Sequence, residues 1–153
     1  LEIKNHHFLI DCGEGTQVQL RKYGVKFAKI KHIFISHLHG DHFFGLVGLI
    51  ATFRLLNRET ELHIYGPKGI KEVITLQLKL SNSWTHYPLY FHELISAESE
   101  LIFEDDKVES LIVHPPSVPS VEYNFPVIDK SVPSQYKLSP LVLPNLNLPS
   151  PPK

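Results

Sequence analysis

The sequence contains 153 residues, 42% of them hydrophobic, and carries a formal net charge of −1 at pH 7. This length fits one ordinary domain, and the near-neutral charge excludes nucleic-acid binding through an overall positive charge, leaving only a local patch or bound metal ions. One cysteine, Cys12, and the lack of any run of about twenty apolar residues exclude an intramolecular disulfide and a membrane-spanning helix, which favours a cytoplasmic protein.

The first part of the chain alternates short apolar runs with helical patterns. Residues 8–10 predict a buried strand that ends at Asp11, and a helix follows a glycine-rich turn over roughly Thr16 to Tyr23. A second strand is predicted over 32–36. Its centre is entirely apolar, which is typical of a strand covered on both faces.

Residues 43–56 predict a single, deeply packed helix, because apolar side chains surround it almost completely. A third strand over 61–65 leads to a helix that opens at Gly66 and Pro67, with proline in its first turn, and runs to about Leu80. The order strand, helix, strand, helix, strand, helix predicts an α/β layered fold.

The pattern changes after Ser83. Strands are predicted over 89–94, 101–104 and 108–113. Beyond His114 prolines recur, and each removes a backbone donor and restricts the residue before it. We therefore expect a domain over residues 1–114, followed over 115–153 by an extended segment across the surface or a partly disordered arm.

Three histidines and a carboxylate come directly after the second predicted strand, namely His37, His39, Asp41 and His42. Imidazole nitrogen and carboxylate oxygen are donors that hold Zn²⁺ or Mn²⁺. A solvated, histidine-rich turn is the alternative, but such tracts are uncommon. The carboxyl end of a sheet strand is also where open α/β folds place their ligands. The cluster therefore predicts a metal site.

The spacing within the cluster allows two ions. His37 and His39, two apart in an extended loop, can point to one side and form a three-nitrogen site with a histidine from elsewhere. Asp41 and His42 can serve a second ion. Two metals about 3.5–4 Å apart clamp the attacking and leaving oxygens in phosphodiester hydrolysis and activate a bridging water. This arrangement predicts a metal-dependent hydrolase.

Three segments carry a resemblance to a known family. They are HxHxDH at 37–42, DCGEGTQ at 11–17 and YGP at 65–67. The first resembles the signature of the metallo-β-lactamase superfamily, and the other two make residues 8–80 similar to the ribonuclease Z family, whose members trim the 3′ trailer from precursor tRNA. The resemblance implies an α/β fold of the αββα sandwich type, incomplete in this chain.

The resemblance also implies the roles of site residues. His37 and His39 would bind one zinc ion, and Asp41 and His42 the other, with Mn²⁺ as a possible replacement. Asp41 would in addition accept the proton of the attacking water. His114, at the end of an apolar run, is the best candidate for the third zinc histidine, although the Gly-Tyr pair expected after it is absent.

The resemblance also concerns residues that support the site and ligands that this chain lacks. Asp11 would hold the metal loop by hydrogen bonds and not bind metal itself. The bridging aspartate and final histidine of the family have no counterpart, because Asp129 follows His114 too closely and no histidine comes later. The family implies precursor tRNA as partner and a homodimer. The absence of methionine indicates a fragment, a processed form or an incomplete sequence.

Two alternatives remain open. One is another hydrolase of the superfamily, arylsulfatase-like or a cyclic-nucleotide phosphodiesterase, and the other is a non-catalytic fragment or RNA-binding partner. The remaining histidines are not expected to bind metal: His6, His7, His32, His63, His86 and His92. His32 and His63 are predicted to be structural, and the aromatic stretch around His86 and His92 is predicted to be core, with stacking on bases as the alternative. A basic set between Arg21 and Lys31 could contact RNA phosphates or form an ordinary solvated face. Cys12 is predicted to be a small buried residue.

Overall fold

The computed structural model describes residues 1–4, 6–95, 100–105, 108–112, 127–129 and 131. In chain order the elements are β1 (Glu2–Ile3), β2 (His6–Ile10), α1 (Thr16–Lys22), a 3-10 helix (Phe27–Lys29), β3 (Ile30–Phe34), α2 (Gly40–Phe43), α3 (Leu46–Leu55), β4 (Leu62–Pro67), α4 (Ile70–Leu80), β5 (Leu89–Leu94), β6 (Glu100–Glu104), β7 (Val108–Ile112) and β8 (Val127–Asp129). Strands and helices alternate as far as β5, as predicted. Within the described ranges, no helix is both long and apolar enough to cross a bilayer.

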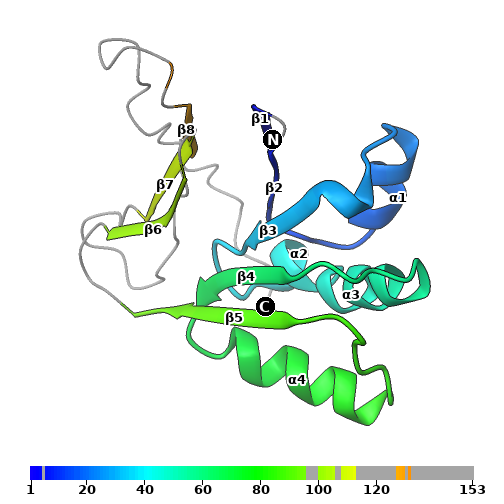
Figure 1. Ribbon diagram of the computed structural model, residues 1–153. Coiled ribbons are helices and arrows are strands. Elements are labelled where there is room, and N and C mark those ends of the chain that lie inside the picture. Colours follow the sequence, from blue (N-terminus) through cyan, green and yellow to red (C-terminus); the bar gives the residue numbers. More distant parts are fainter. Residues whose placement is uncertain (5, 96–99, 106–107, 113–126, 130, 132–153) are drawn as a thin grey trace, which may run out of the picture.

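The described strands form two sheets. Strands β1 to β5 lie side by side in sequence order, and all neighbours pair in parallel except β1 with β2. Strands β6, β7 and β8 form a smaller antiparallel sheet, seen at the upper left of Figure 1. The parallel sheet requires crossover connections, and helices α1 to α4 lie along these.

The two faces of the larger sheet pack against different parts of the chain. On one face Ile33 and Ile64 pack in a mainly aliphatic cluster with buried residues of α3 and α4 such as Leu49. On the other face Phe34 packs in a second cluster with Val108 of the smaller sheet. Ile33 and Phe34 are both fully buried. Burial on both sides is what the apolar centre of this strand predicted.

Helix α4 shows why the sequence folds as it does locally. Ile70, Ile74 and Leu78 recur at a spacing of four residues and are buried, while the charged side chains of the helix are exposed. The same helix corrects one prediction. Pro67 is the last residue of β4, and α4 starts only after Gly69, whose φ of 100° is readily available to glycine alone.

The helix predicted over 43–56 corresponds to α3, but α3 starts only at Leu46, because Phe43 is the last residue of α2 and a break follows it. The backbone N–H of Gly45 donates to Cys12 O at 2.9 Å, so the segment after β2 takes up a hydrogen bond that would otherwise remain inside one helix. A Cβ on Gly45 would lie 1.9 Å from Gly13 O. The glycines permit this close backbone contact.

The later strands agree with the predicted ones in position. Strand β5 has the predicted bounds, and β6 and β7 match the predicted extended pieces within a residue. From the proline-rich segment 115–153, strand β8 is described and pairs antiparallel with β7. The boundary at residue 114 and the character of the rest of that segment fall outside the described residues and stay predictions.

Candidate metal-binding site

The histidine cluster lies where β3 ends. His37 and His39 belong to the loop between β3 and α2, whereas Asp41 and His42 belong to the single turn of α2. Neighbouring strands hold the loop in place: Ile35 N donates to Tyr65 O of β4 at 2.8 Å, and Asp11 N donates to Phe34 O at 2.7 Å. The cluster therefore lies at the carboxyl edge of the parallel sheet, as the sequence predicted.

The structure brings together all four cluster residues that the sequence singled out. The ring centroid of His37 lies 4.6 Å from that of His39 and 3.8 Å from that of His42. Asp41 Oδ2 lies 3.3 Å from His42 Nε2, and the Asp41 side chain is 77% exposed. His114, the fifth predicted ligand, falls outside the described residues. The loop thus presents three imidazoles and an accessible carboxylate on one local surface.

The donor set fits the predicted metal in its chemistry but not in the number of ligands. Neutral imidazole and carboxylate suit Zn²⁺ or Mn²⁺ in chemistry. Among the described residues, no three His, Cys, Asp or Glu side chains are placed to hold one ion. The sequence prediction assigns only two donors of the loop to each ion, so a third ligand for either ion would have to come from outside the described part of the chain.

Asp11 joins the cluster to the sheet through its carboxylate. Ser36 N donates to Asp11 Oδ1 at 2.8 Å, and Ser36 Oγ donates to the same carboxylate at 2.9 and 3.0 Å. His42 Nδ1 lies 2.8 Å from Asp11 Oδ2. The φ of Asp11 is 56°, a region in which aspartate is enriched among non-glycine residues. These bonds match the loop-holding role that the resemblance implied.

The segment after Asp11 touches the cluster through its backbone. Cys12 N donates to His42 O at 2.6 Å, and a Cβ on Gly13 would lie 2.0 Å from Asp41 O. Cys12 itself is fully buried, as predicted, and burial raises the pKa of its thiol to about 12. The thiol therefore stays protonated at neutral pH and does not serve as a nucleophile.

Ser36, Gly13 and Gly45 are site residues that the sequence reasoning missed. Ser36 is 6% exposed and contacts both His37 and His42. Its position directly before the cluster was the only available signal. Nothing in the sequence pairs Gly13 with Asp41, because that contact arises only when β2 and β3 are neighbours.

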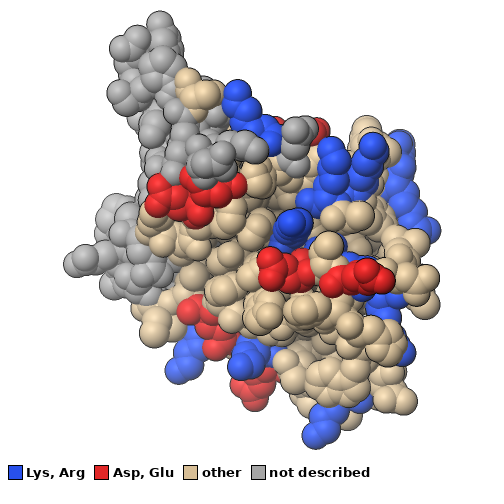
Figure 2. Space-filling model, viewed as in Figure 1, with Lys and Arg blue, Asp and Glu red and all other residues tan. Residues whose placement is uncertain are grey.

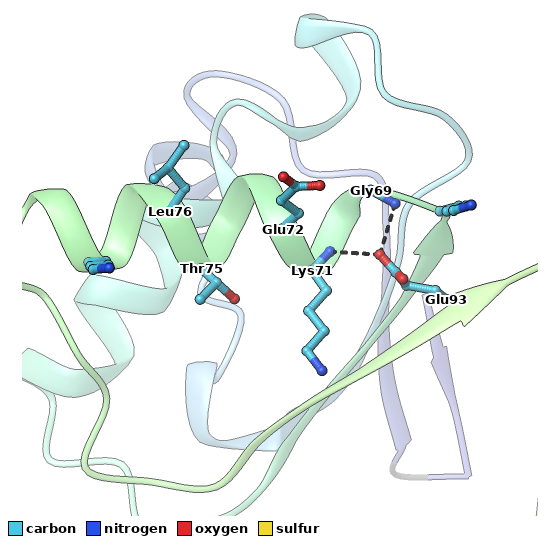
Figure 3. Close-up of a pocket in the computed structure, with 8 residues that line it drawn as sticks. Gly69, Lys71, Glu72, Thr75, Leu76 and Glu93 are labelled. Carbon is cyan, nitrogen blue, oxygen red and sulfur yellow. Dashed lines mark hydrogen bonds between the residues drawn. The ribbon is translucent and has the colours of Figure 1, made fainter.

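A groove of about 700 Å³ runs beside the start of α4 (Figure 3). At its end Glu93 Oε1 accepts hydrogen bonds from Gly69 N at 2.8 Å and Lys71 N at 3.2 Å. The helix N-terminus already holds a carboxylate, so its free N–H groups are not an anion site. A Cβ on Gly69 would lie 3.5 Å from Leu38 Cδ1, which places this end of the helix against the metal loop.

Another group of histidines lies on the strands, away from the loop. His32 and His63 stack with ring centroids 5.3 Å apart, and His63 Nδ1 lies 2.9 Å from His92 Nε2. Burial, with the neighbouring His63, lowers the pKa of His32 to about 4. Each ring is packed or hydrogen bonded within the sheet, as predicted for structural histidines.

Comparison with known proteins places the chain among others of this architecture. The family model described as Anti-Pycsar protein Apyc1 matches residues 1–114. The chain is similar to Ribonuclease Z of Bacteroides fragilis, with 50% identity over 105 residues, which make up 69% of this chain and 34% of that relative. It spans about a third of the length of the curated relatives that it matches.

Solved structures give the same placement. The crystal structure of human tRNase Z, short form, matches with a TM-score of 0.76 and 34% identity, covering 86% of this chain and 56% of that chain. The metallo-beta-lactamase fold protein YhfI from Bacillus subtilis matches with a TM-score of 0.59 and 21% identity over 85% of this chain and 48% of its own. The second likeness concerns the fold alone. Together they confirm the predicted α/β fold of the metallo-β-lactamase type.

Proposed function

Because the chain belongs to the family of the Apyc1 model and to the ribonuclease Z group of the metallo-β-lactamase family, we propose that the full-length protein is an endoribonuclease that removes the 3′ trailer from precursor tRNA. The observation that carries the proposal is the convergence of His37, His39 and His42 at the end of β3, with the Asp11 carboxylate behind them. Imidazole nitrogens and a carboxylate gathered on one accessible surface are the donors that Zn²⁺ or Mn²⁺ takes in proteins.

In the proposed site, His37 and His39 hold one zinc ion, and Asp41 and His42 hold the second. His114 is the proposed third nitrogen ligand of the first ion. Zinc bound by these residues, or Mn²⁺ in its place, would lower the pKa of a water and stabilise negative charge on the phosphodiester oxygens.

Two carboxylates of the chain have proposed roles beside the metal ions. Asp41 is exposed and lies 3.3 Å from His42 Nε2, so its carboxylate can reach both the loop and an incoming substrate. It accepts the proton of the attacking water. Asp11 holds the His42 ring through Nδ1 at 2.8 Å and so directs the opposite nitrogen away from the sheet.

Precursor tRNA is the proposed partner, and its phosphates require positive charge. Lys and Arg side chains gather over α1, whereas acidic side chains lie in the middle of the same view and also among the basic side chains around α4 (Figure 2). Lys68, Lys71 and Lys79 line the groove beside α4. Phosphate contacts of this kind weaken steeply with added salt. A homodimer in the cytoplasm is the proposed working form.

The test is cleavage of a precursor tRNA by the full-length protein, with and without a chelator. His39→Ala is expected to abolish cleavage, whereas His86→Ala, which changes a histidine that contacts Arg54 at 3.3 Å outside the cluster, leaves it intact. Cleavage that persists in His39→Ala contradicts the mechanism. An aryl sulfate and a cyclic nucleotide serve as competing substrates, and hydrolysis of either without tRNA cleavage favours that alternative.

Metal content separates the enzyme from a non-catalytic protein. Two zinc equivalents in each full-length chain are expected. A chain that binds no metal after exposure to zinc or manganese would instead be the RNA-binding alternative. The oligomeric state is read from the same samples by light scattering.

A further inference from the structure

The hydroxyl of Ser36 lies between the carboxylate and two of the rings. Ser36 Oγ is 2.9 Å from Asp11 Oδ1, 3.0 Å from His37 Nδ1 and 3.2 Å from His42 Nδ1. The side chain belongs to a residue that is only 6% exposed. Water therefore has little access to this hydroxyl, and its proton and lone pairs are shared among these groups.

The chemistry of the partners decides where each proton lies. An ionised carboxylate only accepts hydrogen bonds, so the single hydroxyl proton of Ser36 points to Asp11. The oxygen of Ser36 is then left to accept, and its contact with His37 Nδ1 requires a proton on that nitrogen. In a neutral imidazole the lone pair is consequently on Nε2. His42 reaches the same state directly, since its Nδ1 donates to Asp11 Oδ2 at 2.8 Å.

We propose that Ser36 is a positioning residue that transmits the acceptor character of Asp11 to His37 and thereby keeps Nε2 as the metal-binding nitrogen of that ring. The inference rests on the proposed metal-binding role of His37. It makes one half-buried carboxylate, that of Asp11, set the same tautomer in two histidines that are assigned to different ions. The partner of the second ring nitrogen is what orients a ligating histidine.

The two histidines are expected to respond differently when the hydroxyl is removed. Ser36→Ala takes away the acceptor that Ser36 offers to the Nδ1 proton of His37. The bond from the backbone N–H of residue 36 to Asp11 at 2.8 Å and the bond between His42 and Asp11 both remain. The effect should therefore appear at His37 and be absent at His42, which a general loss of structure would not produce.

The experiment uses the metal-free full-length protein with ¹⁵N-labelled histidine, at a mildly alkaline pH. Ring-nitrogen NMR shifts report the tautomer of each histidine. We expect His37 and His42 to carry the proton on Nδ1 in the wild type. In Ser36→Ala, His37 gains the Nε2–H tautomer, and the zinc dissociation constant rises by about tenfold to hundredfold. Ser36→Thr restores both readouts because it keeps a hydroxyl.

Ser81→Ala is the matched control, since Ser81 Oγ donates to Gln77 O at 2.7 Å at the far end of α4. It should behave as the wild type. An unchanged His37 tautomer or an unchanged zinc affinity in Ser36→Ala overturns the proposal. If Ser36→Ala does not fold, the wild type alone decides, because a proton on Nε2 of its His37 also overturns it.

Cleavage of precursor tRNA by the zinc-loaded wild type is measured separately. Absence of cleavage refutes the proposed function, while the tautomers still report on Ser36. An active enzyme whose His37 tautomer is independent of Ser36 refutes only the role of Ser36.

Discussion

The described chain holds two groups of three histidines that differ in what surrounds them. In the loop group, His37, His39 and His42 follow β3 with their rings close together, and His42 Nδ1 lies 2.8 Å from the Asp11 carboxylate. In the strand group, His32, His63 and His92 lie on β3, β4 and β5 among aromatic rings.

The difference shows what turns a histidine cluster into a candidate metal site. In the loop group an acceptor-only carboxylate bonds to Nδ1 of His42 and, through Ser36, faces Nδ1 of His37, which leaves the Nε2 atoms for a metal. In the strand group the rings partner one another, since His63 Nδ1 bonds to His92 Nε2, and burial lowers the pKa of both His32 and His92. Four variants can break or sharpen this comparison.

Asp11→Ala is expected to have the largest effect, because it removes the acceptor shared by Ser36 and His42. Zinc affinity should fall by about a hundredfold, and the free energy of unfolding by about 1–3 kcal/mol for the donors left unpaired. Zinc titration and urea unfolding measure the two losses. The ring-nitrogen shifts of His32 and His63 should not move, and a zinc affinity equal to that of the wild type would show that the loop group does not depend on this carboxylate.

Gly45→Ala tests the backbone contact that supports the loop group. The added Cβ would meet Gly13 O at 1.9 Å, so the two segments must separate. We expect a loss of about 3 kcal/mol in the free energy of unfolding. The matched control is Gly48→Ala in α3, whose Cβ would meet only the flexible end of Gln17 at 3.3 Å. If both variants unfold at the same urea concentration, the close contact between Gly45 and Gly13 does not contribute to the free energy of unfolding.

The strand group predicts a pH dependence of stability. The pKa of His32 is about 4 in the folded protein, below its ordinary value of 6.5. The unfolded chain therefore binds the proton first as the pH falls, and stability is lost from pH 6.5 down to about 4. By pH 5 the loss should be about 2 kcal/mol.

His32→Phe keeps a ring in the stack and removes the titrating group. Urea unfolding of the metal-free protein at several pH values should show a shallower slope for this variant between pH 6.5 and 4 than for the wild type. Equal slopes would mean that His32 does not titrate differently on folding.

Glu93→Ala is expected to have the smallest effect. It removes the carboxylate that accepts from Gly69 N and Lys71 N at the start of α4. Loss of such a cap lowers the free energy of unfolding by about 1 kcal/mol. Glu72→Ala removes a charge from the same helical turn without these two bonds, so its thermal unfolding should change less. If Glu72→Ala lost more thermal stability than Glu93→Ala, the stabilisation by Glu93 would be due to its charge and not to its two hydrogen bonds.

Elements that depend on residues close together in the sequence were predicted, and features that depend on residues far apart were not. The strand over residues 89–94 and the helix from Thr16 were predicted because hydrophobic periodicity is local. The break between α2 and α3 was not predicted. It depends on the hydrogen bond from Gly45 N to Cys12 O, which nothing in the sequence around Gly45 indicates. The start of α4 was wrong for a related reason: Pro67 extends β4 because β5 pairs with it, at Leu94.

The sequence by itself determined which metal donors stand together, because His37, His39, Asp41 and His42 are joined by a few peptide bonds and cannot separate. Only the tertiary structure decided what lies behind them. Asp11 is 25 residues from Ser36 and 31 from His42, and it reaches both because β2 and β3 pair in parallel and end at the same edge of the sheet. Hydrogen bonds across such separations depend on strand pairing, which no local pattern specifies.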